Sequence, residues 1–446
     1  MSALRMRRIL LWSILAIPIV AFYTILAIHV LNVPFLDDYE TVLPFMTQFS
    51  QLGTLHRIGL IFTFQHNEYK LIFENAIFAL QYLFLHHPNF IFLCIVGDLL
   101  VLALFAAIWS FLLPAHEFDR KLLLALPIAY ALFELRYAPT LNWSMAALQN
   151  ISVPVAVLWT IWCLVQKRYL RACILFGLAI CCSGNGFLLF PIGLWLLRRH
   201  RKALLGWLVT CFGMIALYSY HYVRYTIHGA AHGQAANVLS PLSLLEHLNP
   251  LFALSFMGSV IGVHWVVSAA VGAALVTGIV LMVHTGFDRV NPTAFYFAVF
   301  LVITAICVSS IRSSLGLVES FTGRYRIYSV LLFVCVYLFT VERSFRWYRP
   351  ALAASILLCI FGDVYGHSFY RSQARWMHDQ ALAYTYDICG DDEECQLRHD
   401  DLVAAQPLYR LPPEFTVADA RVKSLLNGEE VKHNAAGDGR GGSPRH

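Results

Sequence analysis

The sequence predicts an all-α, polytopic membrane protein, a bundle of transmembrane helices. Of its 446 residues, 59% are hydrophobic and only 13% are charged, and the mean hydropathy is +0.62. A soluble domain is about 45–50% apolar and about 25% charged, so a chain of this composition has more apolar surface than soluble cores can bury. These values exclude a cytosolic enzyme, a nucleic-acid-binding protein and a disordered chain. Nine apolar runs are interpreted as full spans: residues 9–31, 89–113, 122–137, 151–165, 204–220, 258–283, 293–311, 327–341 and 351–364.

The first apolar run is expected to remain as a membrane span. It is longer than the apolar region of a signal peptide and has no small-residue cleavage site. Arg5, Arg7 and Arg8 precede it, and basic flanks favour the cytoplasmic side, so the N-terminus is predicted to be cytoplasmic.

A further apolar stretch, residues 172–197, is broken by the turn sequence Ser183-Gly184-Asn185-Gly186. Both of its flanks are basic, which implies an even number of crossings. Its halves hold about 12 residues each, fewer than the roughly 20 that a straight span needs. A short broken hairpin is therefore predicted, which gives eleven passes in all and an extracytoplasmic C-terminus.

The first outer loop, residues 33–88, contains one ambiguous segment. Residues 69–85 are apolar but include Glu74, Asn75 and Gln81. If this segment spanned the membrane, the number of crossings between the first outer loop and the basic residues 167–171 would be even. Those basic residues would then lie on the outer side, against the positive-inside bias. We therefore expect an interfacial helix there, within a transmembrane domain of residues 1–365.

The remaining residues form a polar tail. Residues 366–433 are expected to be a small extracytoplasmic appendage, and the Gly-rich residues 434–446 to be disordered. Nine of the eleven cysteines lie in apolar stretches, whereas Cys389 and Cys395 lie in this tail. Disulfides persist outside the cytosol, so these two are predicted to form one.

The most informative polar residues follow the first span. Asp37 and Asp38 are adjacent carboxylates at its outer mouth, and such a carboxylate can accept a proton from an attacking hydroxyl or amine. A divalent metal ion could also bind at this pair. The alternative is that the pair only marks the start of a solvated loop.

Three other outer patches carry candidate substrate-binding residues. They contain His66 and Glu68, then Trp143 and Gln149, and finally Arg312, Arg324 and Tyr325 with Arg326 nearby; Asn185 at the hairpin tip joins them. Arginine binds phosphate in a bidentate manner, and three arginines in one outer loop oppose the general bias of basic residues to the inside. Hydrated loops and snorkelling arginines are the alternatives.

This pattern resembles the GT-C superfamily of integral-membrane glycosyltransferases. The shared features are a first span that leads directly to an acidic pair, an interfacial helix, about eleven passes and Gly323-Arg324-Tyr325 before a late span. Residues 133–149 and the break at residues 183–186 resemble elements of uncharacterised bacterial members.

The resemblance implies transfer of a sugar from a polyprenyl-phosphate donor to an envelope glycan or lipid acceptor, outside a bacterial inner membrane. Asp37 and Asp38 would then be catalytic, and Arg312, Arg324 and Tyr325 would bind the donor phosphate. The chain departs from oligosaccharyltransferases because it has no Trp-Trp-Asp motif. A transporter or flippase for lipid-linked sugars or other solutes, with Asp98 and Asn185 as its mid-membrane polar residues, and a non-catalytic scaffold remain alternatives.

Overall fold

The computed structural model is an all-α polytopic membrane protein, as the sequence predicts. It describes residues 3–67, 69–113, 117–223, 247–385, 392–406, 408–410 and 412. Among these residues, eight helices are long and apolar enough to cross a membrane: α1 (Ala3–His29), α5 (Phe90–Phe111), α8 (Ser144–Val165), α11 (Arg201–Ser219), α14 (Trp265–His284), α16 (Pro292–Arg312), α17 (Gly323–Arg343) and α18 (Tyr348–Thr385).

Eight helices of this length compare with the nine full spans predicted. The run at residues 122–137 forms instead the 15-residue helix α6 (Phe118–Leu132), the 3-10 turn η1 (Leu135–Tyr137) and the short helix α7 (Ala138–Leu141). At 1.5 Å per residue, α6 is about 22 Å long, short of the roughly 30 Å of a bilayer core. The break occurs at the buried Glu134, whose carboxylate pairs with the backbone and side chain of Arg136.

The predicted span at residues 258–283 begins later than expected. Residues 250–257 form α13 (Pro250–Met257), and the chain then turns before α14 starts at Trp265. Gly262 in this turn has a φ of +56°, a region that side chains rarely adopt. A Cβ at Gly262 would also press on the Arg326 guanidinium, so the turn is fixed by a polar contact that the hydropathy pattern does not reveal.

The broken hairpin has the expected short arms. Helices α9 (Tyr169–Cys182) and α10 (Leu189–Leu197) flank the 3-10 turn η2 (Gly184–Leu188). Gly186 lies so close to the backbone of Ala179 that any Cβ would overlap it. The glycine at the tip therefore allows the turn to fold back onto α9.

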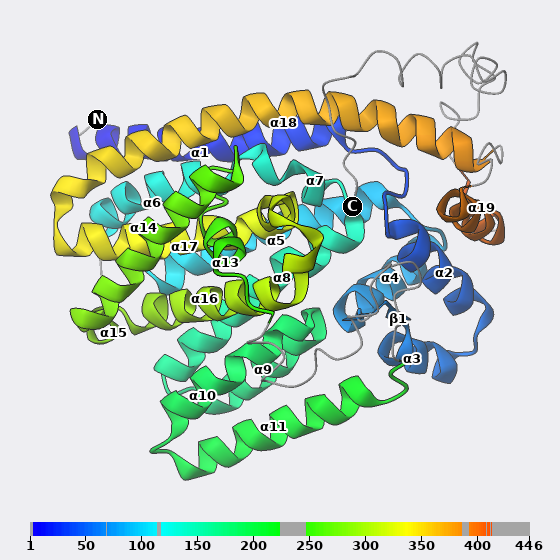
Figure 1. Ribbon diagram of the computed structural model, residues 1–446, viewed down its shortest axis with the longest axis horizontal. Helices are drawn as coiled ribbons and strands as arrows, with labels where there is room; N and C mark the ends of the chain where they lie inside the picture. The colour runs from blue at the N-terminus through cyan, green and yellow to red at the C-terminus, as the bar shows by residue number, and fades with distance from the viewer. Residues whose placement is uncertain are drawn as a thin grey trace.

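A group of short elements covers one end of the bundle, and we call it the end cap (Figure 1). It contains α2 (Asp38–Gln51), α3 (Thr54–Thr63), α4 (Ile72–Leu85), α19 (Glu393–Ala405) and the antiparallel hairpin of β1 (Gln65–His66) and β2 (Tyr69–Lys70). The N-terminus lies at the opposite end of the bundle (Figure 1). Helix α4 covers most of the ambiguous segment 69–85 and, with 14 residues, is shorter than the roughly 20 that a span needs.

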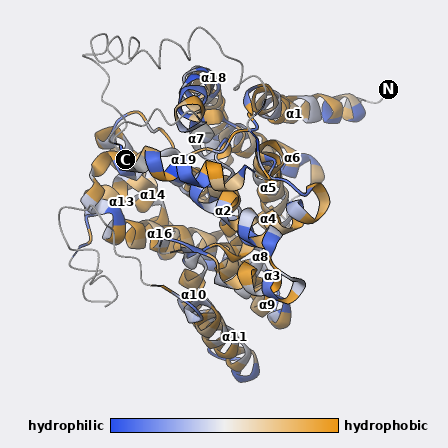
Figure 2. Ribbon diagram, turned by 90° about the vertical axis from the view of Figure 1, so that its right-hand side faces the viewer, coloured by the Kyte–Doolittle hydropathy of each residue, from blue (hydrophilic) through white to orange (hydrophobic). Residues whose placement is uncertain are grey.

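The cap has its own hydrophobic core, which joins α2 and α4 to the C-terminal region. Phe45 and Phe78 are fully buried in it, with Tyr384 of α18 packed edge-on against Tyr39. Seen from the cap end, α19 is largely hydrophilic, whereas the bundle helices are mostly hydrophobic (Figure 2). The cap therefore has a polar outer helix, α19, over its own hydrophobic core.

The tail is continuous with the bundle at its start. Helix α18 runs for 38 residues through the predicted boundary at residue 366. Cys395 of α19 is disulfide-bonded, whereas Cys389 lies outside the described residues, so the pairing of the two remains a prediction. The predicted disordered end, residues 434–446, also lies outside the described residues.

The remaining short elements are connectors at the ends of the long helices. They are α15 (Phe287–Val290), η4 (Ser313–Leu315), η5 (Leu317–Phe321) and η6 (Phe345–Trp347).

The predicted orientation can be tested by labelling single cysteines in a cysteine-free background. We expect an impermeant thiol reagent on intact cells to leave Lys167→Cys and Arg199→Cys unlabelled and to label Arg324→Cys, because basic loops favour the cytoplasmic side. Labelling at position 199 but not at 324 would reverse the orientation.

Candidate functional site

The candidate site is organised by the small hairpin of the end cap. Its strands pair Gln65 with Lys70 and His66 with Tyr69. The open end of the hairpin is fixed to the end of α11, because the Tyr218 hydroxyl accepts a hydrogen bond from the Lys70 amide at 3.1 Å. The Gln65 side chain also exchanges two hydrogen bonds with the Val223 backbone.

Lys70 itself is not available to a ligand. Its side chain is buried and its ammonium group donates to the carbonyls of Tyr220 and Phe62. Burial also lowers the pKa of Lys70. This lysine therefore secures the hairpin to the segments of the protein at residues 62 and 220.

On one side of the hairpin, His66 lies between two carboxylates. Its Nε2 is 3.6 Å from Asp37 Oδ2, and its Nδ1 is 3.7 Å from Glu40 Oε2. Asp37 immediately precedes α2 and Glu40 lies in its first turn, and residues three apart in a helix face the same side. His66 is only 6% exposed, whereas Asp37 and Glu40 are 32% and 37% exposed, so the cluster is open to solvent through its acids.

Helix α19 closes this acidic cluster from the C-terminal side. Arg398 Nε is 3.9 Å from Glu40 Oε1, and Arg398 also donates to the Tyr384 hydroxyl. Burial, with the neighbouring carboxylates Glu40 and Asp400, raises the pKa of Asp401 to about 6. The tail therefore contributes charged groups to the site.

On the second strand of the hairpin, Tyr69 contacts the outer loop that carries Arg312, Arg324 and Arg326, which we call the arginine loop. Its hydroxyl accepts a hydrogen bond of 2.6 Å from Arg312 Nη2, at the end of α16. Arg324, in the first turn of α17, pairs with Glu319 and lies 5.1 Å from the centre of the Tyr325 ring. Arg324 Nε is buried without a hydrogen-bond partner.

The acidic cluster and the arginine loop meet across this hairpin. His66 and Tyr69 are cross-strand partners, and opposed residues of an antiparallel pair have Cα atoms about 4.5–5.5 Å apart with side chains on the same face. Asp37 contacts the first of them, and Arg312 contacts the second. Asp37 and Arg312, from distant parts of the sequence, thus each contact one member of this cross-strand pair.

Asp38 has a different position from that expected of a cavity-lining residue. It is fully buried, and its carboxylate accepts hydrogen bonds from the amides of Phe35, Ser144 and Met145 and from the Ser144 hydroxyl. Trp143, at the N-cap of α8, offers no side-chain acceptor. Asp38 therefore caps α8 from the neighbouring helix, although burial raises its pKa to about 7.

No family model, curated protein or solved structure matches this chain.

The other predicted site residues are dispersed. Trp143 lies at the N-cap of α8, and Gln149 lies in its second turn. The side-chain nitrogens Trp143 Nε1 and Gln149 Nε2 are buried without a hydrogen-bond partner. Asn185, in the turn η2, lies near Tyr328 of α17. Glu68 lies outside the described residues. No hydrogen bond or ion pair between described residues joins Trp143, Gln149 or Asn185 to His66 or Arg312.

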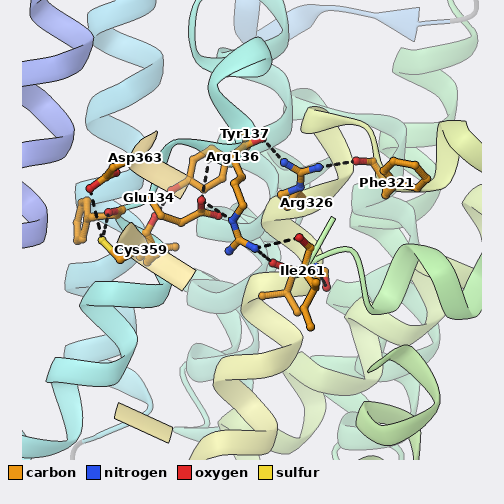
Figure 3. Close-up of polar contacts among 12 residues, drawn as sticks. Glu134, Arg136, Tyr137, Ile261, Phe321, Arg326, Cys359 and Asp363 are labelled. Carbon is orange, nitrogen blue, oxygen red and sulfur yellow. Dashed lines mark hydrogen bonds and ion pairs between the residues drawn. The ribbon is translucent and has the colours of Figure 1, made fainter. Parts of the chain in front are cut away.

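Arg326, the third arginine of the loop, belongs to a buried network (Figure 3). Its guanidinium donates to the backbone carbonyls of Arg136 and Phe321. Arg136 in turn pairs with Glu134 at 2.8 Å and donates to the carbonyls of Val260 and Ile261. The network connects η1, the turn before α14 and the start of α17, so Arg326 holds helices together.

A divalent ion at the acidic pair would depend on Asp37, because Asp38 already accepts four hydrogen bonds in a fully buried position. In the described part of the chain, no group of three or more His, Cys, Asp or Glu residues is arranged to hold a metal ion.

The sequence interpretation missed Glu40, Tyr69 and Arg398 as members of the site. Glu40 has a usable signal, because it follows Asp37 by three residues at a helix start. Tyr69 lies in the same polar run as His66 and Glu68. Nothing local in the sequence relates Arg398 to residue 40.

Glu74 on α4 should make stability depend on pH. It is fully buried, neither carboxylate oxygen has a hydrogen-bond partner, and burial raises its pKa well above 4.5. The folded protein therefore binds a proton that the unfolded chain releases, and the contribution of Glu74 to stability is greatest at low pH. As the pH rises above 4.5, stability should fall by up to about 1.4 kcal/mol per unit until the folded pKa is passed.

Thermal melting in detergent from pH 5 to 9 tests this expectation. Glu74→Gln should weaken the decline, whereas the exposed control Glu117→Gln should retain it. Parallel melting profiles for Glu74→Gln and the wild type would contradict the assignment.

Proposed function

We propose that this protein is a membrane glycosyltransferase that moves a sugar from a polyprenyl-phosphate donor to an envelope acceptor on the extracytoplasmic face. One observation supports the proposal: Asp37 and Glu40 contact His66, and Arg312 contacts Tyr69, the cross-strand partner of His66 in the hairpin. Group transfer from a phosphate needs a base for the acceptor and cations for the leaving group.

The proposed base is Asp37. Its carboxylate is partly exposed and faces His66, so an acceptor hydroxyl can approach it. The acceptor oxygen forms a bond to the anomeric carbon of the sugar while its proton passes to Asp37. The bond from that carbon to the phosphate oxygen breaks, and its electron pair leaves with the polyprenyl phosphate.

The proposed phosphate-binding residues are Arg312 and Arg324. Both lie at helix ends, and Arg312 contacts Tyr69 of the hairpin. The buried Nε of Arg324 lacks an acceptor that a phosphate oxygen would supply. A guanidinium stabilises the charge that develops on the leaving phosphate. Tyr69 holds Arg312 toward the acid side, which would bring base and leaving group to one substrate.

The proposal is tested with the purified full-length protein in proteoliposomes, labelled polyprenyl-phosphate sugars and envelope extracts. Arg312→Gln is expected to lower the transfer rate about 10-fold to 100-fold at low donor concentration, since charge-assisted hydrogen bonds contribute about 1.5–3 kcal/mol. The matched control is Arg346→Gln, an exposed arginine in η6. Absence of transfer with every donor, or equal rates in the two variants, would refute the proposal.

The transporter alternative is favoured by one observation. Asp98 lies in the middle of α5, is 5% exposed, and its Oδ1 has no hydrogen-bond partner. Ionisable groups inside spans often mark transport pathways. The same proteoliposomes distinguish the two functions. Transport is supported if the labelled lipid-linked sugar crosses the bilayer without being transferred and if Asp98→Asn abolishes this movement.

A further inference from the structure

The end of the bundle opposite the end cap carries a groove that the proposed function does not use. It lies where the end of α5, the end of α8 and the start of α9 meet, and its volume is about 460 Å³. This volume is within the range of small-molecule sites, about 300–1,000 Å³. Its walls combine Phe111, Trp159, Trp162 and Ile174 with two arginines, Arg168 and Arg171.

The apolar wall of the groove faces outward. Trp159 is 46% exposed and Ile174 is 63% exposed. Trp162 stacks on Phe111 with ring centres 4.4 Å apart. Helix α8 is long and apolar enough to cross a membrane, and a tryptophan pair near a helix end is typical of the bilayer interface. We therefore expect these exposed apolar side chains of α8 and α9 to face hydrocarbon.

The two arginines lie at the polar edge of the same groove. The Arg168 guanidinium lies 4.7 Å from the centre of the Trp162 ring, a cation–π contact that positions it beside the apolar wall. Arg171 lies one helical turn further along, and both side chains are exposed. Within the described residues, neither guanidinium forms an ion pair with a carboxylate.

The segment that carries the two arginines has only basic charged residues. Ring contact between Tyr169 and His200 places the basic residues 198–202 beside residues 167–171. The chain contains no Asp or Glu between Glu134 and Glu246, so this segment supplies no counter-charge of its own. An anion with an apolar tail would satisfy both parts of the groove.

We propose that the groove binds an anionic phospholipid of the surrounding leaflet, with its headgroup phosphate on Arg168 and Arg171 and an acyl chain against Trp159 and Ile174. Guanidinium groups bind phosphate oxygens in pairs, and basic pockets between spans recognise anionic headgroups. The occupant is a bilayer lipid because the apolar wall faces the membrane and continues directly from the arginines. This site is independent of the proposed transferase activity.

Native mass spectrometry of the purified full-length protein tests the proposal. The protein is mixed with equal amounts of phosphatidylglycerol, cardiolipin and phosphatidylethanolamine, and the retained lipid is counted. We expect the anionic lipids to be retained about tenfold more than phosphatidylethanolamine, since tenfold corresponds to one charge-assisted contact of about 1.4 kcal/mol. The double variant Arg168→Gln/Arg171→Gln should lose this preference.

The matched control is Arg199→Gln/Arg201→Gln, which removes the same charge from the neighbouring loop but not from the groove. It should keep the preference within about twofold, as expected for exposed charges that do not contact the lipid. Equal loss in the two double variants would show diffuse attraction and overturn the proposal, as would retention of the preference after loss of Arg168 and Arg171.

A last variant tests the apolar half of the site. Trp159→Ala should reduce phosphatidylglycerol retention while leaving the melting temperature unchanged, because its side chain is largely exposed. If retention is unchanged, or if inorganic phosphate displaces the lipid completely at low millimolar concentration, the groove does not bind the acyl chain and the proposal fails.

Discussion

Replacing Asp37 by Asn is expected to lower the rate of sugar transfer by about 10²-fold to 10⁴-fold, the usual contribution of a general base. The carboxylate is partly exposed and 3.6 Å from His66, and its removal leaves shape unchanged while abolishing proton acceptance. The melting temperature should barely change, because Asp37 forms no side-chain cap for α2 and exposed charge pairs contribute about 0–1 kcal/mol.

The measurement is initial rate in proteoliposomes with thermal melting of the same preparation. Glu40→Gln is the companion variant, since Glu40 faces the other nitrogen of His66; it should be affected less if Asp37 alone accepts the proton. Full activity of Asp37→Asn would remove Asp37 from the mechanism.

Replacing Asp38 by Ala is expected to destabilise the protein by about 3 kcal/mol or more. The change leaves the amides of Phe35, Ser144 and Met145 buried without their acceptor, and each such donor costs about 1–3 kcal/mol. The effect should be concentrated at the start of α8, where two of these amides are the first helical donors that otherwise have no partner.

Melting temperature and hydrogen exchange at residues 144 and 145 measure this effect. Because burial raises the pKa of Asp38 to about 7, the folded state holds its proton more tightly than the unfolded chain. The advantage of the wild type over Asp38→Ala should therefore shrink as the pH rises from about 4 through 7. Asp37→Ala is the matched control, and melting of Asp38→Ala within a degree of it would contradict the capping role.

The adjacent acids illustrate what local sequence could predict. Their position after the first span was informative about the location of a polar site, and Asp37 does join a cluster there. Successive helical residues point about 100° apart, so the two acids point in different directions. Asp37 faces His66 and solvent, whereas Asp38 faces α8. The sequence contains no signal for which residue faces which way, because the direction depends on how α2 packs on α8.

The two arginines at the start of α17 also point in different directions. Arg324 and Arg326 are two positions apart at the start of α17, about 200° apart around the helix. Arg324 therefore lies beside Tyr325 and Glu319, whereas Arg326 points into the bundle toward the backbone of Arg136. Charge counting could predict the loop, but it could not separate a candidate ligand-binding arginine from a structural one.

The sequence by itself determined the membrane class, most of the spans and the broken hairpin, because the cost of placing apolar residues in water depends on composition and run length alone. Tertiary structure decided which polar groups meet. Arg312 and Tyr69 are 243 positions apart, and Arg398 reaches Glu40 only because α19 packs on α2. Such contacts depend on the three-dimensional packing of helices, whose directions are fixed by many side chains together and not by any local pattern.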